Sequence, residues 1–267
     1  MPPLGGGMEI YMRIVIKVGT STLAHKTGHL NIRMIETLCK VISDLKNAGH
    51  EIILVSSGAI GMGMGKLHLS ERPRELSMKQ AAAAVGQCEL MYFYDKLFSE
   101  YNHTVAQILL NADDLRVEDR HRNFDNTMKC LLSMGVIPII NENDTVATEE
   151  IEIGDNDTLS AIVAVSVNAD LAVLLSDIDG LFTADPRKDP NATLIPDVYG
   201  ITDEIMALGG TPGSQLGTGG MLTKLRAAKI TGEGGCDMII TNGATPECLY
   251  DIVDGKAIGT RFHAKKN

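Results

Sequence analysis

Acidic and carboxamide side chains crowd the segment between residues 141 and 157, and no lysine or arginine interrupts them. The segment reads Asn-Glu-Asn-Asp, then a short apolar and acidic stretch, then Gly-Asp-Asn-Asp. Carboxylates this close repel one another unless an ammonium group, a hydrated Mg²⁺ or hydrogen-bond donors lie among them, so a folded protein seldom keeps them without a partner. The segment therefore predicts a site for a cation.

A lysine near the N-terminus lies in a setting that suits an anion. Lys17 comes at the end of an apolar run and is followed by Gly19, Thr20 and Ser21. Glycine lets the backbone approach an anion closely, and the two hydroxyls add hydrogen-bond donors, so the group has the features of a phosphate cradle. Taken alone, Lys17 could equally extend from the edge of a strand toward solvent.

A second glycine-rich element covers residues 217–224 and ends on Lys224. It continues into apolar residues at helical spacing, which a flexible linker would not do. Free N–H groups at a helix start, with a lysine one turn later, suit a polyphosphate. The residue order is not that of a Walker A loop, and no G-x-G-x-x-G fingerprint follows the first strand, so a dinucleotide dehydrogenase loses support.

Two lysine-bearing anion sites and one acidic pocket in the same chain indicate phosphoryl transfer. The negative charge of a moving phosphoryl group has to be matched on both the donor and the acceptor side, and two lysines with Mg²⁺ can do this without a covalent intermediate. A carboxylate close to the lysines would hold them in place.

The composition favours small molecules as partners. The chain has 267 residues, 44% of them hydrophobic, and a formal net charge of −10. This charge argues against nucleic acid or an anionic membrane as a partner, because both require a positive face.

Five scattered cysteines without a C-x-x-C pair indicate reduced thiols and a cytoplasmic location. We expect residues 1–11 to be a disordered leader, with Met1, Met8 or Met12 as the start, and we find neither an export signal nor a membrane span.

Five short runs rich in β-branched residues are each about as long as one strand. They are residues 13–18, 51–55, 136–140, 171–175 and 238–241. Amphipathic segments of helical length separate them, at residues 31–48, 75–99, 117–134, 155–169 and 221–234. Strands that are apolar on both sides need helices on both faces of a mainly parallel sheet, so we predict an α/β fold with three layers, α/β/α. In such sheets ligands bind beyond the carboxyl ends of the strands.

Six motifs in order along the chain resemble those of the amino acid kinase family. They are Lys-Val-Gly-Thr-Ser at 17–21, Ser-Gly-Ala-Ile at 57–60, Asn-Glu-Asn-Asp-Thr-Val at 141–146, Gly-Asp-Asn-Asp-Thr-Leu-Ser at 154–160, Gly-Leu-Phe-Thr-Ala-Asp-Pro-Arg at 180–187 and Gly-Thr-Gly-Gly-Met-Leu-Thr-Lys at 217–224. Within the family they resemble the branch that acts on L-glutamate, as does the segment 79–87. The resemblance covers nearly the whole chain. It implies ATP- and Mg²⁺-dependent phosphorylation of the γ-carboxylate of L-glutamate, the first step of proline biosynthesis.

The resemblance also implies roles for individual residues. Lys17 and Lys224 would stabilise the transferring phosphoryl group, and Asp157 would orient both lysines rather than act as a base, since the acceptor carboxylate is already ionised at neutral pH. The nucleotide would contact Lys17, Ser176, Asp177, Thr218, Gly219, Gly220, Met221, Leu222, Thr223 and Lys224. The glutamate pocket would comprise Ser57, Gly58, Ala59, Asn141, Asp144, Asp155 and Asn156. No side chain is assigned as a metal ligand.

The acidic segment favours glutamate over the acceptors of related enzymes. Asp144, together with Asp155, offers a counter-charge to the α-ammonium group, while the backbone N–H groups of Gly58 and Ala59 could bind a carboxylate. N-acetylglutamate would leave the acids unpaired, and UMP would need basic residues around its phosphate. A nucleotide-binding sensor without turnover is a rival of another class, but the presence of both lysines and their carboxylate favours an enzyme.

We expect residues 12–267 to form a single amino acid kinase domain, with 12–170 mainly on the acceptor side and 171–267 mainly on the nucleotide side. Many relatives of this branch continue into a PUA domain, and we expect none here, because the chain ends at Asn267. The resemblance further implies a homo-oligomer, feedback inhibition by proline, and coupling to a reductase that takes glutamate 5-phosphate.

Overall fold

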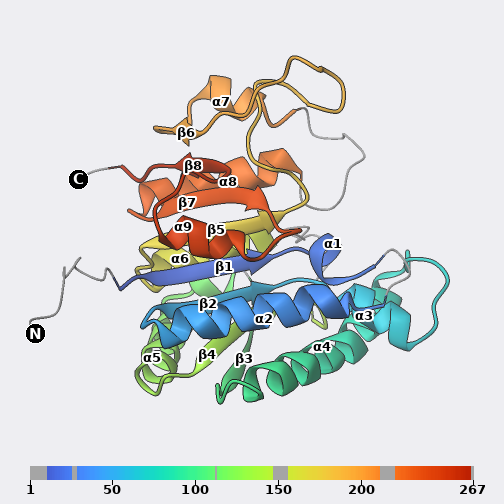
Figure 1. Ribbon diagram of the computed structural model, residues 1–267. Coiled ribbons are helices and arrows are strands. Elements are labelled where there is room, and N and C mark those ends of the chain that lie inside the picture. The colour runs from blue at the N-terminus through green and yellow to red at the C-terminus, as the bar shows by residue number, and fades with distance from the viewer. Residues whose placement is uncertain (1–10, 26–28, 112, 147–155, 211–219, 266–267) are drawn as a thin grey trace, which may run out of the picture.

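In the computed structural model, which describes residues 11–25, 29–111, 113–146, 156–210 and 220–265, the described strands form one eight-stranded sheet (Figure 1). The strands are β1 (Arg13–Val18), β2 (Glu51–Ser56), β3 (Val105–Leu110), β4 (Ile137–Glu142), β5 (Leu171–Ser176), β6 (Asp197–Val198), β7 (Asp237–Asn242) and β8 (Thr260–Phe262). Their order is β3-β4-β2-β1-β5-β7-β8-β6. Among the paired strands, only β7 and β8 run antiparallel. The predicted mainly parallel α/β sheet is therefore confirmed.

Helices cover both faces of the sheet. They are α1 (Thr20–Leu23), α2 (Ile32–Asn47), α3 (Ala59–Lys66), α4 (Leu76–Ser99), α5 (Glu118–Ser133), α6 (Asn156–Ser166), α7 (Asp203–Ala207), α8 (Met221–Glu233) and α9 (Cys248–Val253), with a 3₁₀ turn, η1 (Asp114–Arg116). Figure 1 shows α2 and α9 in front of the sheet and α6 and α8 behind it. The sheet is thus the middle of three layers, as the alternation of apolar runs predicts.

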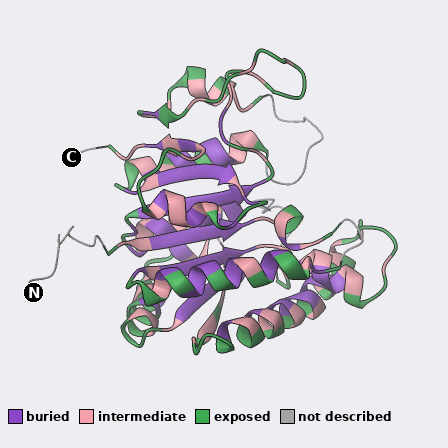
Figure 2. Ribbon diagram, viewed as in Figure 1, coloured by how far each residue is buried: buried purple, intermediate pink, exposed green. Residues whose placement is uncertain are grey.

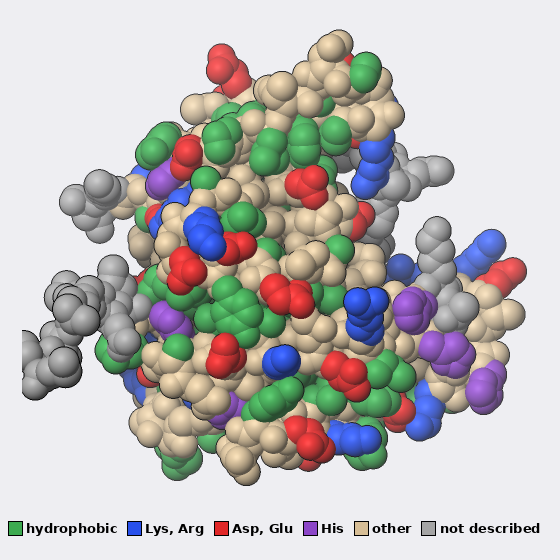
Figure 3. All heavy atoms as spheres, in the orientation of Figure 1, with side chains coloured by type: hydrophobic (Ala, Val, Ile, Leu, Met, Phe, Trp, Pro, Cys, Tyr) green, Lys and Arg blue, Asp and Glu red, His purple; other side chains and the backbone are tan. Residues whose placement is uncertain are grey.

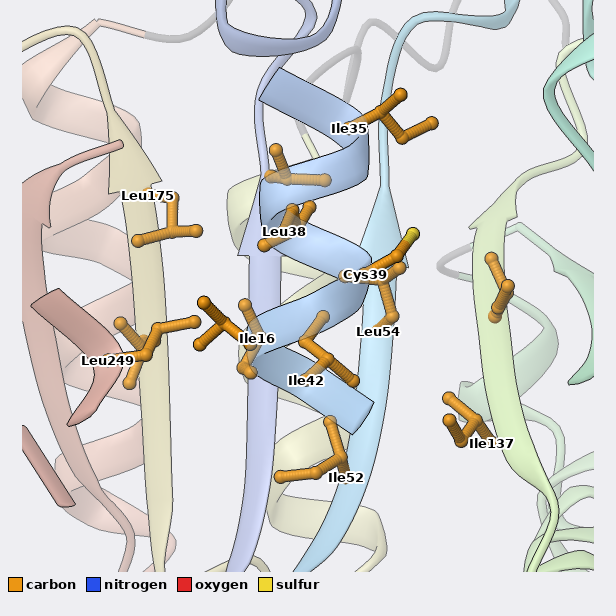
Figure 4. Close-up of a cluster of buried hydrophobic side chains, with 14 of the residues drawn as sticks. Ile16, Ile35, Leu38, Cys39, Ile42, Ile52, Leu54, Ile137, Leu175 and Leu249 are labelled. Carbon is orange, nitrogen blue, oxygen red and sulfur yellow. The ribbon is translucent and has the colours of Figure 1, made fainter. Parts of the chain in front are cut away.

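Side-chain alternation along each strand builds a separate core on each face of the sheet. In β1, Ile14, Ile16 and Val18 belong to the cluster under α2, α4 and α9, whereas Val15 belongs to the cluster under α5, α6 and α8. Figure 4 shows side chains of α2 packed over Ile16 and its neighbours on the adjoining strands. Because successive strand residues point to opposite faces, Lys17 shares the face of Val15 and lies beneath α6 and α8.

The burial pattern agrees with this layered arrangement. In Figure 2 the central strands are buried along their length, while the helices alternate buried and exposed turns. All six residues of β5 are buried, which is expected for a parallel strand covered on both faces.

Helices α3 and α4 pack unusually closely, and glycine makes this possible. A Cβ atom added to Gly63 of α3 would lie 1.8 Å from the carbonyl oxygen of Ala82, and one added to Gly86 of α4 would lie 1.7 Å from that of Ala59. The close contact fixes the start of α3, which directly follows the Ser57–Gly58 turn at the end of β2. Packing against α4 therefore supports the turn at Ser57 and Gly58.

Gly86→Ala is expected to lower the free energy of unfolding by about 1–3 kcal/mol or more, because the added methyl group meets backbone atoms that cannot move aside easily. Urea unfolding followed by circular dichroism measures the change. Ala84→Ser on the exposed side of the same helix is the matched control and should cost about 0.5 kcal/mol or less. Equal stability of the Gly86 variant and wild type would contradict the close packing.

The surface carries mixed charge on the face shown in Figure 3, where acidic and basic side chains are interspersed among the described residues. Within the described part of the chain, none of the helices combines the length and apolar character needed to cross a bilayer.

Candidate active site

The predicted polar residues lie at the carboxyl ends of four neighbouring strands in the middle of the sheet. Lys17 is near the end of β1, and Ser57 directly follows β2. Asn141 is the second-last residue of β4, and Ser176 is the last residue of β5. Parallel strands end at the same edge of a sheet, so these side chains are brought to one crevice although they are far apart in sequence.

A buried carboxylate joins the two predicted lysines. Asp157, the second residue of α6, is fully buried, and one of its oxygens accepts a hydrogen bond from Nζ of Lys17. The other oxygen, Oδ2, accepts from Nζ of Lys224 at 2.9 Å and from Oγ1 of Thr223 at 3.1 Å. Lys17 therefore points inward from a central strand and does not extend from a sheet edge to solvent.

The charges of Lys17, Lys224 and Asp157 suit the binding of an anion. Burial raises the pKa of Asp157, but the charges and hydrogen bonds of Lys17 and Lys224 outweigh burial and hold the pKa of that carboxyl below its usual value. Asp157 is thus ionised at neutral pH. Two buried ammonium groups are thus held side by side on one carboxylate. Fixed ammonium donors of this kind suit a phosphoryl group, which is negatively charged.

A second cluster, made of amides and a hydroxyl, lies on the β2 and β4 side of the site. Nδ2 of Asn156 donates to Oγ of Ser57 at 2.7 Å and lies 3.0 Å from Oδ1 of Asn141. It also lies 3.2 Å from the carbonyl oxygen of Ser56. The structure thus brings together three residues that were expected to bind glutamate. Since Asn156 and Asp157 are consecutive on α6, this cluster adjoins the lysine pair.

Helix α4 contributes one side chain to the site that sequence reasoning did not assign, Gln87, and a second, Tyr94, that supports strand β2 beside the site. Oε1 of Gln87 accepts a hydrogen bond from Nδ2 of Asn141 at 2.8 Å, and the hydroxyl of Tyr94 lies 2.9 Å from Oγ of Ser56. Both residues are on the buried face of α4, at helical spacing from the buried Ala83 and Leu90. A glutamine on an otherwise apolar buried face is the signal that could have identified Gln87.

The turn after β2 has the geometry expected for carboxylate binding. Gly58 adopts a left-handed conformation with φ of 103°, which favours glycine, and it caps the start of α3. Ala59 is the first residue of α3, where backbone N–H groups lack intrahelical acceptors. These N–H groups are donors of the kind that a substrate carboxylate requires.

Asp144 is a partly buried carboxylate beyond β4. Burial raises its pKa, and the charge of Arg72 lowers it only in part. A carboxylate that has lost some of its water gains from a cationic ligand. Asp155, the second acid expected to face the ammonium group, lies outside the described residues.

The predicted nucleotide residues lie after β5 and at the start of α8. Ser176 is buried, and its hydroxyl donates to Oδ1 of the exposed Asp177 at 3.2 Å. Gly220 is the N-cap of α8 in an extended conformation. Met221, Leu222 and Thr223 form the first turn; the N–H of Thr223 donates to the carbonyl oxygen of Gly220 at 3.1 Å, whereas those of Met221 and Leu222 face the open end of the helix. Thr218 and Gly219 lie outside the described residues.

The donor set bears on how Mg²⁺ can be held. Within the described ranges, no three His, Cys, Asp or Glu side chains lie together in a way that could hold a metal ion. Both oxygens of Asp157 are already engaged by lysines. The described residues fit an ion bound mainly by phosphate oxygens and water, the usual state of Mg²⁺ with a nucleotide.

Comparison with solved structures supports the fold. The structure is similar to carbamate kinase from Giardia lamblia bound to AMP-PNP, with a TM-score of 0.66 and 17% identity over 97% of this chain and 100% of that chain. It is also similar to the isopentenyl phosphate kinase product complex of T. acidophilum, with a TM-score of 0.62 and 18% identity over 93% of this chain and 99% of that chain. At these identities the likeness concerns the fold alone.

Comparison of sequences identifies the family. The model of the amino acid kinase family matches residues 12–242. The glutamate 5-kinase of Clostridium perfringens is 53% identical over 95% of this chain and 96% of its own length. The glutamate 5-kinase of Listeria monocytogenes serovar 1/2a is 53% identical over 95% of this chain and 94% of its own length. The chain therefore belongs to the amino acid kinase family, and within it to the glutamate 5-kinases.

Proposed function

We propose that this chain transfers the γ-phosphoryl group of ATP to the γ-carboxylate of L-glutamate and forms L-glutamate 5-phosphate, the first step of proline biosynthesis. The family membership supports this reaction. The observation that carries the proposal is the buried Asp157, which holds Lys17 and Lys224 together next to the Ser57, Asn141 and Asn156 cluster. These contacts support an anion site beside an amino acid site at the carboxyl end of the sheet.

The chemistry needs no covalent intermediate and no general base. An oxygen of the γ-carboxylate attacks the γ-phosphorus, a new O–P bond forms, and the bond from phosphorus to the bridging oxygen breaks with its electron pair leaving on ADP. The acceptor is ionised at neutral pH, so no proton has to be removed. Mg²⁺ bound to the phosphates would neutralise part of their charge. Lys17 and Lys224 supply fixed positive charge to the transferring group.

Asp157 has the properties of an orienting group. Both of its oxygens accept hydrogen bonds from ammonium groups, and its pKa is held low, so it is a poor proton acceptor. We propose that it fixes the two ammonium groups at the separation required to bind the phosphoryl group during its transfer. On the nucleotide side, Ser176, Asp177 and the start of α8 would contact ATP, with Thr218 and Gly219 completing the loop.

The acceptor pocket is proposed to match each end of the amino acid. Asp144, with Asp155, would face the α-ammonium group, and the N–H groups of Gly58 and Ala59 would bind a carboxylate. N-acetylglutamate lacks the ammonium charge, so the partly buried carboxylate of Asp144 would lose a charge-assisted partner that the charge of Arg72 replaces only in part. The phosphate of UMP would face the same carboxylate and be repelled.

ADP release with four acceptors tests this proposal. L-glutamate should support turnover, whereas N-acetyl-L-glutamate, L-aspartate and UMP should not. Turnover with one of the other three would keep the kinase chemistry and remove the proposed pocket. ATP binding without turnover of any acceptor would support a nucleotide-binding sensor instead.

Asp144→Asn is expected to raise KM for L-glutamate about 10- to 100-fold or more, since a charge-assisted hydrogen bond contributes about 1.5–3 kcal/mol, while KM for ATP stays within about twofold. The pKa of Asp144 is raised, so in wild type kcat/KM for glutamate should fall as pH drops through that raised pKa and the carboxylate is protonated. In the variant the acid limb due to Asp144 should be absent, and only the fall from protonation of the substrate γ-carboxylate, at a pH of about 4.3, should be left. Equal changes in the two KM values would exclude a substrate role.

We further propose a homo-oligomer that is inhibited by proline and is functionally coupled to a reductase for the unstable acyl phosphate. Exposed apolar side chains on α4, Met78 at 42% and Tyr92 at 58%, support association with another chain. Light scattering on the purified protein measures its mass.

The free cysteines support a reducing compartment such as the cytoplasm.

A further inference from the structure

Gln87 is a buried carboxamide in a place where an apolar residue would be expected. It is 7% exposed and lies on the face of α4 that also carries Ala83, Leu90 and Tyr94, all of them buried. Burying an amide is unfavourable unless its polar atoms are paired. Yet only half of this amide is paired, because Nε2 of Gln87 has no hydrogen-bond partner among the described residues.

The paired half of Gln87 begins a chain of amides that leads to the acceptor site. Its Oε1 accepts from Nδ2 of Asn141 at 2.8 Å. Asn141 must then present Oδ1 on its other side, where this oxygen accepts from the backbone N–H of Glu142 at 2.9 Å and lies 3.0 Å from Nδ2 of Asn156. The contacts on its two sides therefore determine which way the Asn141 amide is turned: Nδ2 toward Gln87 and Oδ1 toward Asn156.

The same logic sets the polarity of Asn156. Its Nδ2 faces Asn141 and donates to Oγ of Ser57 at 2.7 Å. Its Oδ1 is consequently turned away, and it is a buried acceptor without a partner among the described residues. Because Ser57 accepts from Asn156, the proton of its own hydroxyl remains free to be donated. The chain of amides leaves one acceptor and one donor, which match an ammonium group and a carboxylate.

We propose that Gln87 is a positioning residue for L-glutamate, which fixes the orientation of Asn156 through Asn141 so that Asn156 Oδ1 and the Ser57 hydroxyl keep the polarity required by the substrate. The proposal rests on the proposed function, since it names how that same pocket recognises its amino acid. Loss of Gln87 leaves Nδ2 of Asn141 buried without an acceptor, which favours rotation of that amide and releases Asn156.

Gln87→Met tests the proposal, because methionine keeps a similar length and volume but cannot accept the hydrogen bond. KM for L-glutamate should rise about tenfold, which corresponds to about one lost hydrogen bond, while kcat and KM for ATP stay within about twofold. Ser43→Ala is the matched control, since Ser43 is also buried with an unpaired Oγ but lies on α2. The control should leave all three constants unchanged.

Action through Asn141 requires that the effects be non-additive. In the Asn141→Ala background, Gln87→Met should change KM for L-glutamate by less than about twofold, because the link is already broken. Gln87→Asn, one methylene too short to reach Asn141, should reproduce the rise in KM if the methionine variant does not fold. Unchanged KM in either folded variant, an equal rise for ATP and glutamate, or independent effects in the double variant would overturn the proposal. Wild type measured in parallel separates this outcome from failure of the proposed function, in which wild type itself does not turn over L-glutamate.

Discussion

Lys17→Ala is expected to lower kcat by about 10²–10³-fold or more, the loss seen when one fixed donor to a transition-state charge is removed. Lys17 Nζ is one of two ammonium groups held on Asp157 in a buried site. Phosphoryl transfer depends almost entirely on positioning and charge stabilisation, so the remaining lysine cannot replace it. The fold should persist, because Asp157 keeps its hydrogen bond to Lys224 at 2.9 Å.

Steady-state ADP release and a thermal unfolding curve together measure this effect. Lys256→Ala is the matched control, since Lys256 pairs with Asp251 at the surface and its side chain is 61% exposed. The control should keep full kcat and an unchanged Tm. Full activity of the Lys17 variant, with the same Tm as wild type, would contradict the role assigned to the lysine pair.

Asp157→Ala is expected to lower the free energy of unfolding by about 3–5 kcal/mol and to abolish turnover, because it removes the carboxylate that holds both buried ammonium groups. Urea unfolding at pH 7 measures the loss. Asp251→Ala, which breaks the exposed pair with Lys256, is the control and should leave the urea midpoint nearly unchanged. A midpoint for the Asp157 variant equal to that of wild type would contradict the buried ion pair.

The stability loss from Asp157→Ala should depend on pH in a defined direction. The pKa of Asp157 in the folded state is depressed below the unfolded value of about 3.9. A depressed carboxyl pKa contributes stability that is fully present above the unfolded pKa and is lost as pH falls through the folded pKa. The gap between wild type and variant should therefore narrow below about pH 3.9.

The centre of the fold could be predicted from sequence because its strands are apolar on both sides and its helices are long. Strands β1, β2, β4, β5 and β7 fall within a few residues of the predicted runs. Strand β3 was missed because it is an edge strand with an exposed Gln107, and β6 and β8 were missed because they are too short to show a period.

Helix α3 was missed for a different reason. Its sequence contains Gly61, Gly63 and Gly65, which lower helix propensity, and it is stabilised by close packing against α4 instead. A tertiary contact overrides local preference here. No periodic pattern within eight residues could have revealed it.

The site could be predicted only in part from the chain itself. The types and settings of Lys17 and Lys224 indicated anion sites, but Asp157 is 140 residues from one and 67 from the other. Spacing cannot show that three such residues meet; the family resemblance supplied that expectation. Gln87 lies on a helix otherwise read as core, and its hydrogen bond to Asn141 spans 54 residues. Such long-range links depend on how the helix packs.

Trapping of the product with L-glutamate labelled with ¹⁸O in its γ-carboxylate tests the central claim most directly. The wild-type protein is incubated with ATP, Mg²⁺ and hydroxylamine, which attacks the carbonyl carbon of an acyl phosphate. The account predicts γ-glutamyl hydroxamate and inorganic phosphate carrying one ¹⁸O atom, since the carboxylate oxygen becomes the bridging atom to phosphorus. Release of ADP with unlabelled phosphate and no hydroxamate would contradict phosphorylation of the γ-carboxylate.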